Sequence, residues 1–104
     1  MKIIQKISDM IEDNIEEAEK YIKCAMEHKT EYPDLSRVLA NISDNAMSNV
    51  TSLHNIVVQI IEQYRKENGE PPAPMMAVYD YLHKRHIDNA SAVRAMQAMY
   101  KEMR

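Results

Sequence analysis

The longest amphipathic pattern in the chain runs from Leu35 to Tyr64 and predicts one long α-helix. Apolar or small side chains recur there in steps of three and four residues, which places them on one side of a helix. The members of this line are Leu35, Leu39, Ile42, Ala46, Asn49, Leu53, Ile56, Ile60 and Tyr64. We expect this line to face the core. Its centre is unusual, because Ala46 is small and Asn49 carries a carboxamide where a core position favours leucine.

The sequence predicts three helices in all, and the long helix described above is the second of them. The first spans residues of about 3–29, with an apolar stripe formed by Ile4, Ile7, Ile11, Asn14, Ala18, Ile22 and Ala25. The second helix spans about 34–68 and ends at Asn68-Gly69, and the proline-rich residues 69–74 cannot lie inside a helix. The third spans about 75–103 as one continuous helix, in preference to a break within residues 88–91. Its line is Met75, Tyr79, Leu82, His86, Asn89, Val93, Met96, Tyr100 and Met103.

The composition favours a single all-α domain. With 104 residues, nine methionines, one glycine and neither Trp nor Phe, the chain is poor in turn and strand formers. Three long amphipathic helices predict an antiparallel helical bundle that is thin for its length. The methionine-rich third helix supplies apolar surface that one copy does not bury, so we expect a homodimer. The expected interface consists of Met75, Tyr79, Met96, Met99, Tyr100 and Met103.

Charge and cysteine content exclude several classes of protein. The net charge is −3, and no segment has the basic excess that binding to a nucleic acid requires. The single cysteine, Cys24, cannot form an internal disulfide and fits a reducing compartment. Neither a signal peptide nor a membrane span is recognisable, so we expect a soluble, cytoplasmic protein without membrane contacts.

Four stretches resemble the short, rubrerythrin-like bacterial and prophage members of the ferritin-like superfamily. Residues 14–21 read N-I-E-E-A-E-K-Y, which is similar to a first-helix pattern of Glu followed seven residues later by Tyr. Residues 39–53 are similar to a second-helix pattern in which Glu-x-x-His precedes Leu. The sequences G-E-P-P-A-P-M at 69–75 and Y-D-Y-L-H at 79–83 resemble the connector and third helix of the short members.

The resemblance implies a ferritin-like bundle in which the metal ligands have been lost. In that superfamily, inward-facing Glu residues and Glu-x-x-His pairs hold two metal ions in the bundle core. Here Asn14 stands at the position of the first Glu, Ala46 at that of the second, and Asn49 at that of the His. Such a site looks vacated, because an amide binds iron weakly and alanine does not bind it at all. Alternatively, the two asparagines pair with each other and fix the register of their helices.

We therefore expect no cofactor and no catalytic residues. The preferred function is a non-enzymatic, self-associating, helical-bundle protein that derives from a ferritin-like di-metal scaffold and acts through protein contacts with an unidentified partner. The first alternative is a di-iron or di-manganese metal-binding protein or oxidoreductase whose ligands have moved to Glu17, His54, Asp80 and His83. The second alternative is a small phage structural or regulatory protein, which the resemblance alone suggests.

Overall fold

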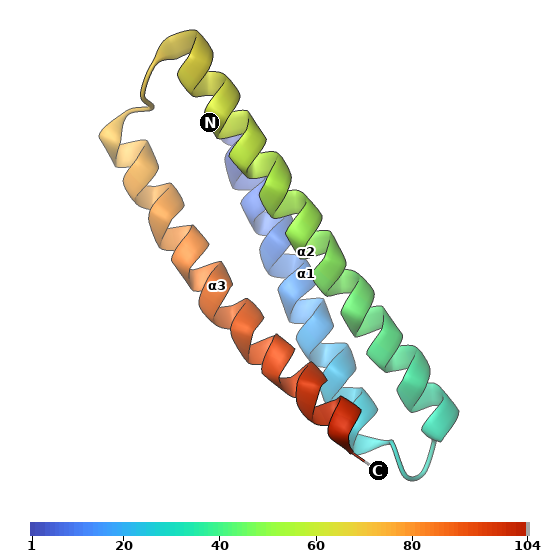
Figure 1. The fold of residues 1–104 in the computed structure, drawn as a ribbon. Helices are drawn as coiled ribbons and strands as arrows, with labels where there is room; N and C mark the ends of the chain where they lie inside the picture. The colour runs from blue at the N-terminus through green and yellow to red at the C-terminus, as the bar shows by residue number, and fades with distance from the viewer. Residues whose placement is uncertain (104) are drawn as a thin grey trace.

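The computed structural model describes residues 1–103 and contains three helices (Figure 1). They are α1 (Lys2–Glu27), α2 (Pro33–Asn68) and α3 (Ala73–Glu102). The prediction of an all-helical chain is confirmed for these residues. Each helix begins one or two residues earlier than expected, and α3 continues without a break through residues 88–91.

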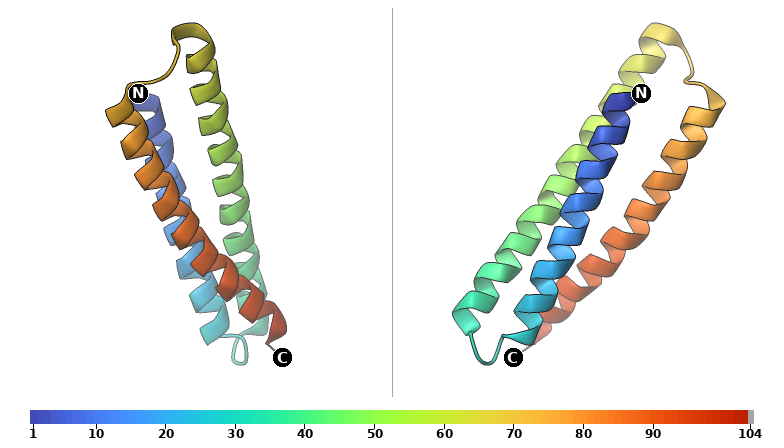
Figure 2. Two further views of the ribbon diagram at one scale, coloured as in Figure 1. Left: turned by 60° about the vertical axis from the view of Figure 1, so that its left-hand side comes forward. Right: turned by 180° about the vertical axis from the view of Figure 1, so that it is seen from behind.

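The helices form a rod of 56 × 19 × 18 Å in which α1 is the common neighbour of the other two. Helix α2 lies along α1 in the opposite direction over most of its length (Figure 1). Helix α3 meets both at the end that holds the α1–α2 connection. From there α3 diverges from α2 towards the proline connector, as Figures 1 and 2 show. The two outer helices therefore lie closest together near the carboxyl end of α3.

Helix α1 supplies the continuous apolar floor of the core. Its buried side chains follow the stripe expected from the sequence, except that Ile15 takes the inward position in place of Asn14. The buried apolar residues of α1 are Ile4, Ile7, Ile11, Ile15, Ala18, Ile22 and Ala25. Ile3 and Met10, also on α1, are about half exposed.

The predicted core line of α2 is confirmed at Ala46, and Leu39, Leu53 and Ile60 are partly buried against the core, but four of its members are exposed. The exposed members are Leu35, Ile42, Asn49 and Ile56. The buried residues of α2 are Ser36, Ala40, Ser43, Ala46, Met47, Val50, Val57 and Ile61. Most of them lie one position after a predicted member, so the buried face is rotated from the predicted one by less than the roughly 100° of a full residue. The rotation brings the smaller side chains against α1, where helices can approach closely, and leaves a row of larger apolar side chains outside.

Two buried serines of α2 connect all three helices. The hydroxyl of Ser36 donates to the carbonyl oxygen of Ala25 at 2.6 Å, and the hydroxyl of Ser43 donates to that of Ala18 at 2.7 Å. On the α3 side, the amide nitrogen of Gln97 donates to the Ser43 oxygen at 2.9 Å. The phenol oxygen of Tyr100 lies 3.0 Å from the Ser36 oxygen. Since both serines are fully buried, these contacts satisfy polar atoms that would otherwise destabilise the core.

The ends of the helices follow local chemistry. Pro33 occupies the first turn of α2, where its missing N–H is not needed. Gly69 terminates α2 with φ of 76°, a conformation that side chains with a Cβ rarely adopt. The sequence signal at Asn68-Gly69 thus corresponds to an actual helix end.

Removing the Ser43 hydroxyl should destabilise the fold. In Ser43→Ala the buried amide of Gln97 loses its acceptor, so we expect the free energy of unfolding to fall by about 1–3 kcal/mol. The matched control is Ser91→Ala on the exposed side of α3, which should change it by no more than about 0.5 kcal/mol. Urea unfolding followed by circular dichroism measures both. Gln97→Met should lower the free energy of unfolding less in the Ser43→Ala background than in the wild type. Equal effects of the two serine substitutions would contradict a stabilising role for the Ser43 hydroxyl.

Candidate functional site: the α2–α3 groove and the uncharged face of α2

The three positions that the resemblance marks as vacated lie together on α1 and α2. The amide nitrogen of Asn49 is 3.4 Å from the side-chain oxygen of Asn14, and Asn14 in turn donates to the carbonyl oxygen of Met10 at 2.8 Å. Ala46 lies one turn before Asn49 and is buried. Asn49 itself is exposed and Asn14 is partly exposed, so the pair lies at the edge of the α1–α2 contact instead of inside the core.

This asparagine pair lies on the flank of α1 that faces away from α3. Glu12 faces α3, because its carboxylate is 3.1 Å from the guanidinium of Arg85. Asn14 follows two residues later, which is a rotation of about 200° around α1. The pair and the α3 helix are therefore on different sides of α1.

The four residues of the alternative metal site do not come together as a set. His54 and His83 are in contact, whereas Glu17 borders the same surface as Asn14 and Asp80 is exposed. Within residues 1–103, no group of three or more His, Cys, Asp or Glu side chains is arranged to hold a metal ion. Iron or manganese binding by this set stays a prediction of the sequence.

Most of the expected interface residues on α3 make contacts within the chain. Met96 packs against the core, Tyr100 contacts Ser36, and Tyr79 stacks on His83. Met75 is also partly buried, and only Met99 and Met103 of the six have exposed side chains.

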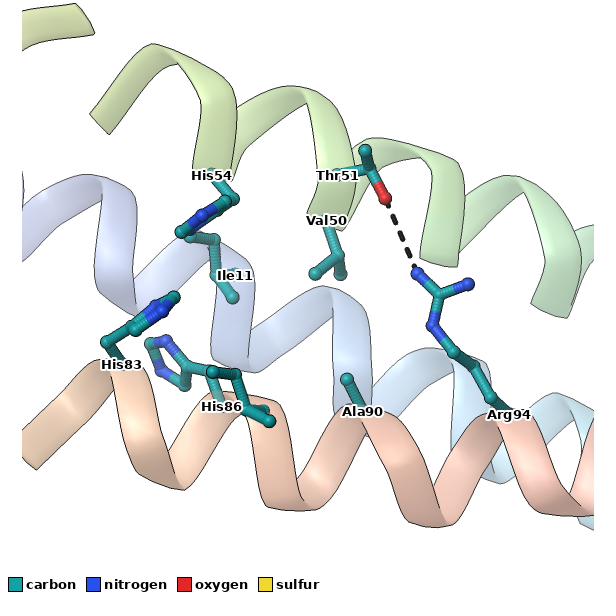
Figure 3. Close-up of a pocket in the computed structure, with 9 residues that line it drawn as sticks. Ile11, Val50, Thr51, His54, His83, His86, Ala90 and Arg94 are labelled. Carbon is teal, nitrogen blue, oxygen red and sulfur yellow. Dashed lines mark hydrogen bonds between the residues drawn. The ribbon is translucent and has the colours of Figure 1, made fainter. Parts of the chain in front are cut away.

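A groove of about 300 Å³ lies between α2 and α3 where the two helices diverge, and α1 forms its floor (Figure 3). Its apolar wall comes from side chains on all three helices, and its two ends are polar. The lining residues are Ile11, Val50, Thr51, His54, His83, His86, Ile87, Ala90 and Arg94. We refer to this cavity as the α2–α3 groove.

Three histidines form one end of the groove. The rings of His54 and His83 stack with centroids 4.6 Å apart and planes at 13°, which connects α2 to α3 (Figure 3). Tyr79 also stacks on His83, with ring centroids 5.7 Å apart and planes at 9°. His86 is only 8% exposed, and its buried Nε2 atom has no hydrogen-bond partner. An unpaired buried nitrogen of this kind is uncommon in a folded protein.

The surroundings of His54 and His86 favour their uncharged forms. Burial lowers the pKa of His54, and the neighbouring His83 lowers it further. Burial is also the main cause that lowers the pKa of His86. The carboxylate of Glu12 partly opposes that shift, while His83, Arg85 and His54 add to it. Both shifts favour the neutral imidazole in the folded protein.

The other end of the groove carries a single guanidinium. Arg94 donates to the hydroxyl oxygen of Thr51 at 3.4 Å (Figure 3). That hydroxyl is itself 3.4 Å from the carbonyl oxygen of Met47. Within residues 1–103, Arg94 forms no ion pair with a carboxylate. Sequence patterns did not identify Arg94, because an arginine on an amphipathic helix is ordinarily a solvated surface residue.

A second feature concerns the outer surface of α2. Residues 45–61 contain no Asp, Glu, Lys or Arg, and the next-longest run without these residues is residues 71–79. Nine of the 17 side chains are nevertheless exposed: Asn45, Ser48, Asn49, Thr51, Ser52, Asn55, Ile56, Val58 and Gln59. We call residues 45–61 the uncharged stretch. A solvated helix surface of this length normally carries charges, and their depletion is typical of the centre of a protein interface.

Comparisons with known proteins find no match to a family model, to a curated protein or to a solved structure. Among residues 1–103, no helix has the length and apolar character needed to cross a membrane. The case for a function consequently depends on the geometry of the chain itself.

The histidine cluster should make stability depend on pH. Because the folded-state pKa values of His54 and His86 are lowered from 6.5, the unfolded chain binds more protons as the pH falls below that value. Their contribution is fully present above about pH 6.5 and is lost as the pH falls through the lowered folded values. We expect the melting temperature to fall between pH 7.5 and pH 5.5.

Histidine variants identify the origin of this pH dependence. His54→Gln and His86→Gln should each flatten the dependence of melting temperature on pH, whatever their effect on stability at pH 7.5. The control is His28→Gln, because His28 contacts Tyr32 at the opposite end of the rod. If all four proteins show the same slope in thermal melts between pH 5.5 and 7.5, the groove histidines are not responsible.

Proposed function

We propose that this protein is a non-enzymatic helical bundle of ferritin-like derivation that self-associates through α2 and acts by protein–protein contacts. The observation that carries the proposal is the uncharged stretch on an exposed helix surface. Burying charged side chains at an interface is costly, and a surface without them can be covered by another protein at little cost.

The spacing of side chains on α2 favours a second copy of the same chain as the partner. Ile42, Asn49 and Ile56 follow one another at intervals of seven residues, so they lie along one side of the helix. The two isoleucines are 38% and 44% exposed. A twofold axis at Asn49, with the two α2 helices antiparallel, places Ile42 of each copy against Ile56 of the other. Such an arrangement satisfies the self-complementarity that a twofold interface requires.

Small side chains around the axis support close helix packing. Ser48 and Ser52 lie before and after Asn49 in the sequence, and both are small and exposed, so a second helix can approach closely there. In this arrangement the exposed amide of Asn49 meets its own counterpart in the second copy. Asparagines that meet in this way fix the register of helices.

The same arrangement gives the vacated ligand positions a role. Asn14 and Asn49 lie beside the proposed axis, and a second copy would enclose them together with Ala46 between two α1–α2 pairs. The enclosed space would correspond to the core of a four-helix bundle. Amides and a methyl group can be buried there without the cost of desolvating the carboxylates and imidazole that the resemblance implies.

Charge insertion at the axis tests the proposal. The wild-type chain should have a mass in solution of twice 12.1 kDa. Asn49→Asp places two carboxylates against each other across the axis, and we expect the dissociation constant of the dimer to rise by roughly 100-fold. Ile56→Glu should have a similar effect because it buries a charge against Ile42. Sedimentation equilibrium measures the masses and the dissociation constants.

Matched controls separate an effect at the axis from an effect of charge alone. Asn55→Asp introduces the same charge in the same stretch, about 120° away around the helix from Asn49. Tyr81→Glu places a charge on an exposed aromatic position of α3. Both should remain dimeric. A monomeric wild type, or equal dissociation by Asn49→Asp and Asn55→Asp, would contradict the proposed interface.

A further inference from the structure

The carboxyl end of α2 brings an exposed carboxamide next to an exposed glycine. Asn68 is the last residue of α2, and the backbone N–H of Gly69 donates to the carbonyl oxygen of Arg65 at 3.0 Å. Gly69 has φ of 76°, and apart from its chain neighbours no heavy atom lies within 4 Å of the position that a Cβ would occupy. Both residues are exposed, so solvent reaches the peptide bond between them.

An asparagine next to glycine is chemically reactive. The backbone nitrogen of the following residue can attack the carboxamide carbon and close a cyclic succinimide. A side chain on the following residue hinders this closure, and glycine has none. The chain contains one glycine and seven asparagines, so Asn68 is the only asparagine with this neighbour. The other six lie inside helices and precede Ile, Val or Ala.

The native end of α2 restrains this reaction only weakly. The helical backbone of Asn68 and the hydrogen bond from Gly69 to Arg65 keep the glycine nitrogen away from the carboxamide, and opening of the last turn removes both restraints. Residues 65–68 are exposed. The ion pair between Arg65 and Glu70, at 3.3 Å, spans the site, but both side chains are exposed and such a pair adds little to stability. A helix end with few buried contacts opens far more often than the core unfolds.

We propose that Asn68 and Gly69 form a self-modification site, which becomes reactive when the last turn of α2 opens. The Gly69 nitrogen bonds to Cγ of Asn68, the Cγ–Nδ2 bond breaks, and ammonia leaves with the proton of the glycine nitrogen. Water then adds to one of the two carbonyl carbons of the succinimide and breaks its bond to that nitrogen. Breaking the new Cγ–N bond gives aspartate, whereas breaking the original peptide bond gives isoaspartate.

Both products weaken the end of α2. A carboxylate at residue 68 is unfavourable next to the negative end of the helix dipole. Isoaspartate also lengthens the main chain by one carbon atom, which displaces the Gly69 N–H from the Arg65 oxygen. Because Gly69 begins the connector to α3, the modification loosens the junction between the two helices. Asn68 follows Asn49 by 19 residues, or about 28 Å along α2, so the site does not depend on the proposed dimer.

Ageing of the full chain at pH 7.5, followed by tryptic peptide mapping, tests the assignment. Trypsin releases residues 67–84, in which Asn68 carries the only side-chain amide, and residues 38–65, which contain four other asparagines. Chromatography with mass spectrometry measures aspartate and isoaspartate in each peptide. We expect both products to accumulate in residues 67–84 at least about tenfold faster than in residues 38–65, because only Asn68 precedes glycine. A synthetic peptide of residues 62–75, which has no stable helix, should react faster than the folded chain.

Three variants separate the chemistry from its control by the helix end. Gly69→Ala should slow the reaction of Asn68 at least about tenfold, since a side chain then hinders ring closure. Ala90→Gly places a glycine after Asn89 in the interior of α3, and Asn89 should still react at least about tenfold more slowly than Asn68 because no helix end opens there. Ser43→Ala lowers the global stability without touching the end of α2, so it should leave the rate at Asn68 unchanged.

Four results would overturn the proposal. One is a folded chain in which Asn68 stays intact over the time that the synthetic peptide needs to react fully. The second is a rate that Gly69→Ala does not lower. The third is equal reaction of Asn68 and of Asn89 in Ala90→Gly, since the helix end would then not control reactivity. The last is a faster reaction in Ser43→Ala, which would show that global unfolding is required.

Discussion

The structure depends on two buried hydroxyl groups, those of Ser36 and Ser43. Each donates to a carbonyl oxygen of α1 and is contacted from α3, so a small polar side chain connects three helices at two levels. A hydroxyl can do this only where helices approach closely, and the alanines at positions 18, 25 and 40 make room for that approach. Because the serines lie in the first third of α2, they hold the carboxyl end of α3 and leave its amino end without an equivalent contact to α2.

The divergence of α2 and α3 follows from this one-sided attachment. Near the carboxyl end of α3, Val93 and Gln97 are buried. From there towards the amino end of α3, the contacts with α2 are the long hydrogen bond from Arg94 to Thr51 and the stacked rings of His83 and His54. The α2–α3 groove occupies this region. Burial lowers the pKa values of His54 and His86 in this region, so the stability that they contribute is lost as the pH falls below that of a free imidazole.

The amphipathic patterns correctly indicated an all-helical chain and the order of its helices, because steps of three and four residues and proline or glycine breaks are local properties. They identified the buried side of α2 only in part. Apolar character ranked Leu35, Ile42 and Ile56 above Ser36 and Ser43, yet the serines are buried because carbonyl groups on another helix satisfy their hydroxyls. A hydrogen-bond partner on a distant segment leaves no periodic pattern in the sequence. The small residues at positions 36, 40 and 43, which follow helical spacing, were the available indication of the buried side of α2.

The candidate sites were predictable to different degrees. The contact between Asn14 and Asn49 could be predicted, because both residues belong to the lines of side chains along which adjacent helices were expected to pack. Their exposure to solvent could not be predicted from those lines. The contact of His54 with His83 joins two of the four residues considered for a relocated metal site, while Glu17 and Asp80 lie elsewhere. Arg94 and the unpaired nitrogen of His86 could be found only from the three-dimensional arrangement. The absence of charge in residues 45–61 is visible in the sequence, but it becomes informative only once that surface is known to be exposed.

The central claim is that two copies pair through antiparallel α2 helices about Asn49, and spin-label distances measure this arrangement directly. Single labels are placed at residue 55 or residue 35, both of which are exposed, in a Cys24→Ser background and measured by double electron–electron resonance. The account predicts a distance of about 20 Å at residue 55 and about 40 Å at residue 35, because the paired labels are separated by 12 and 28 residues of helical rise. Equal distances at both positions, or no dipolar coupling at residue 55, would contradict it.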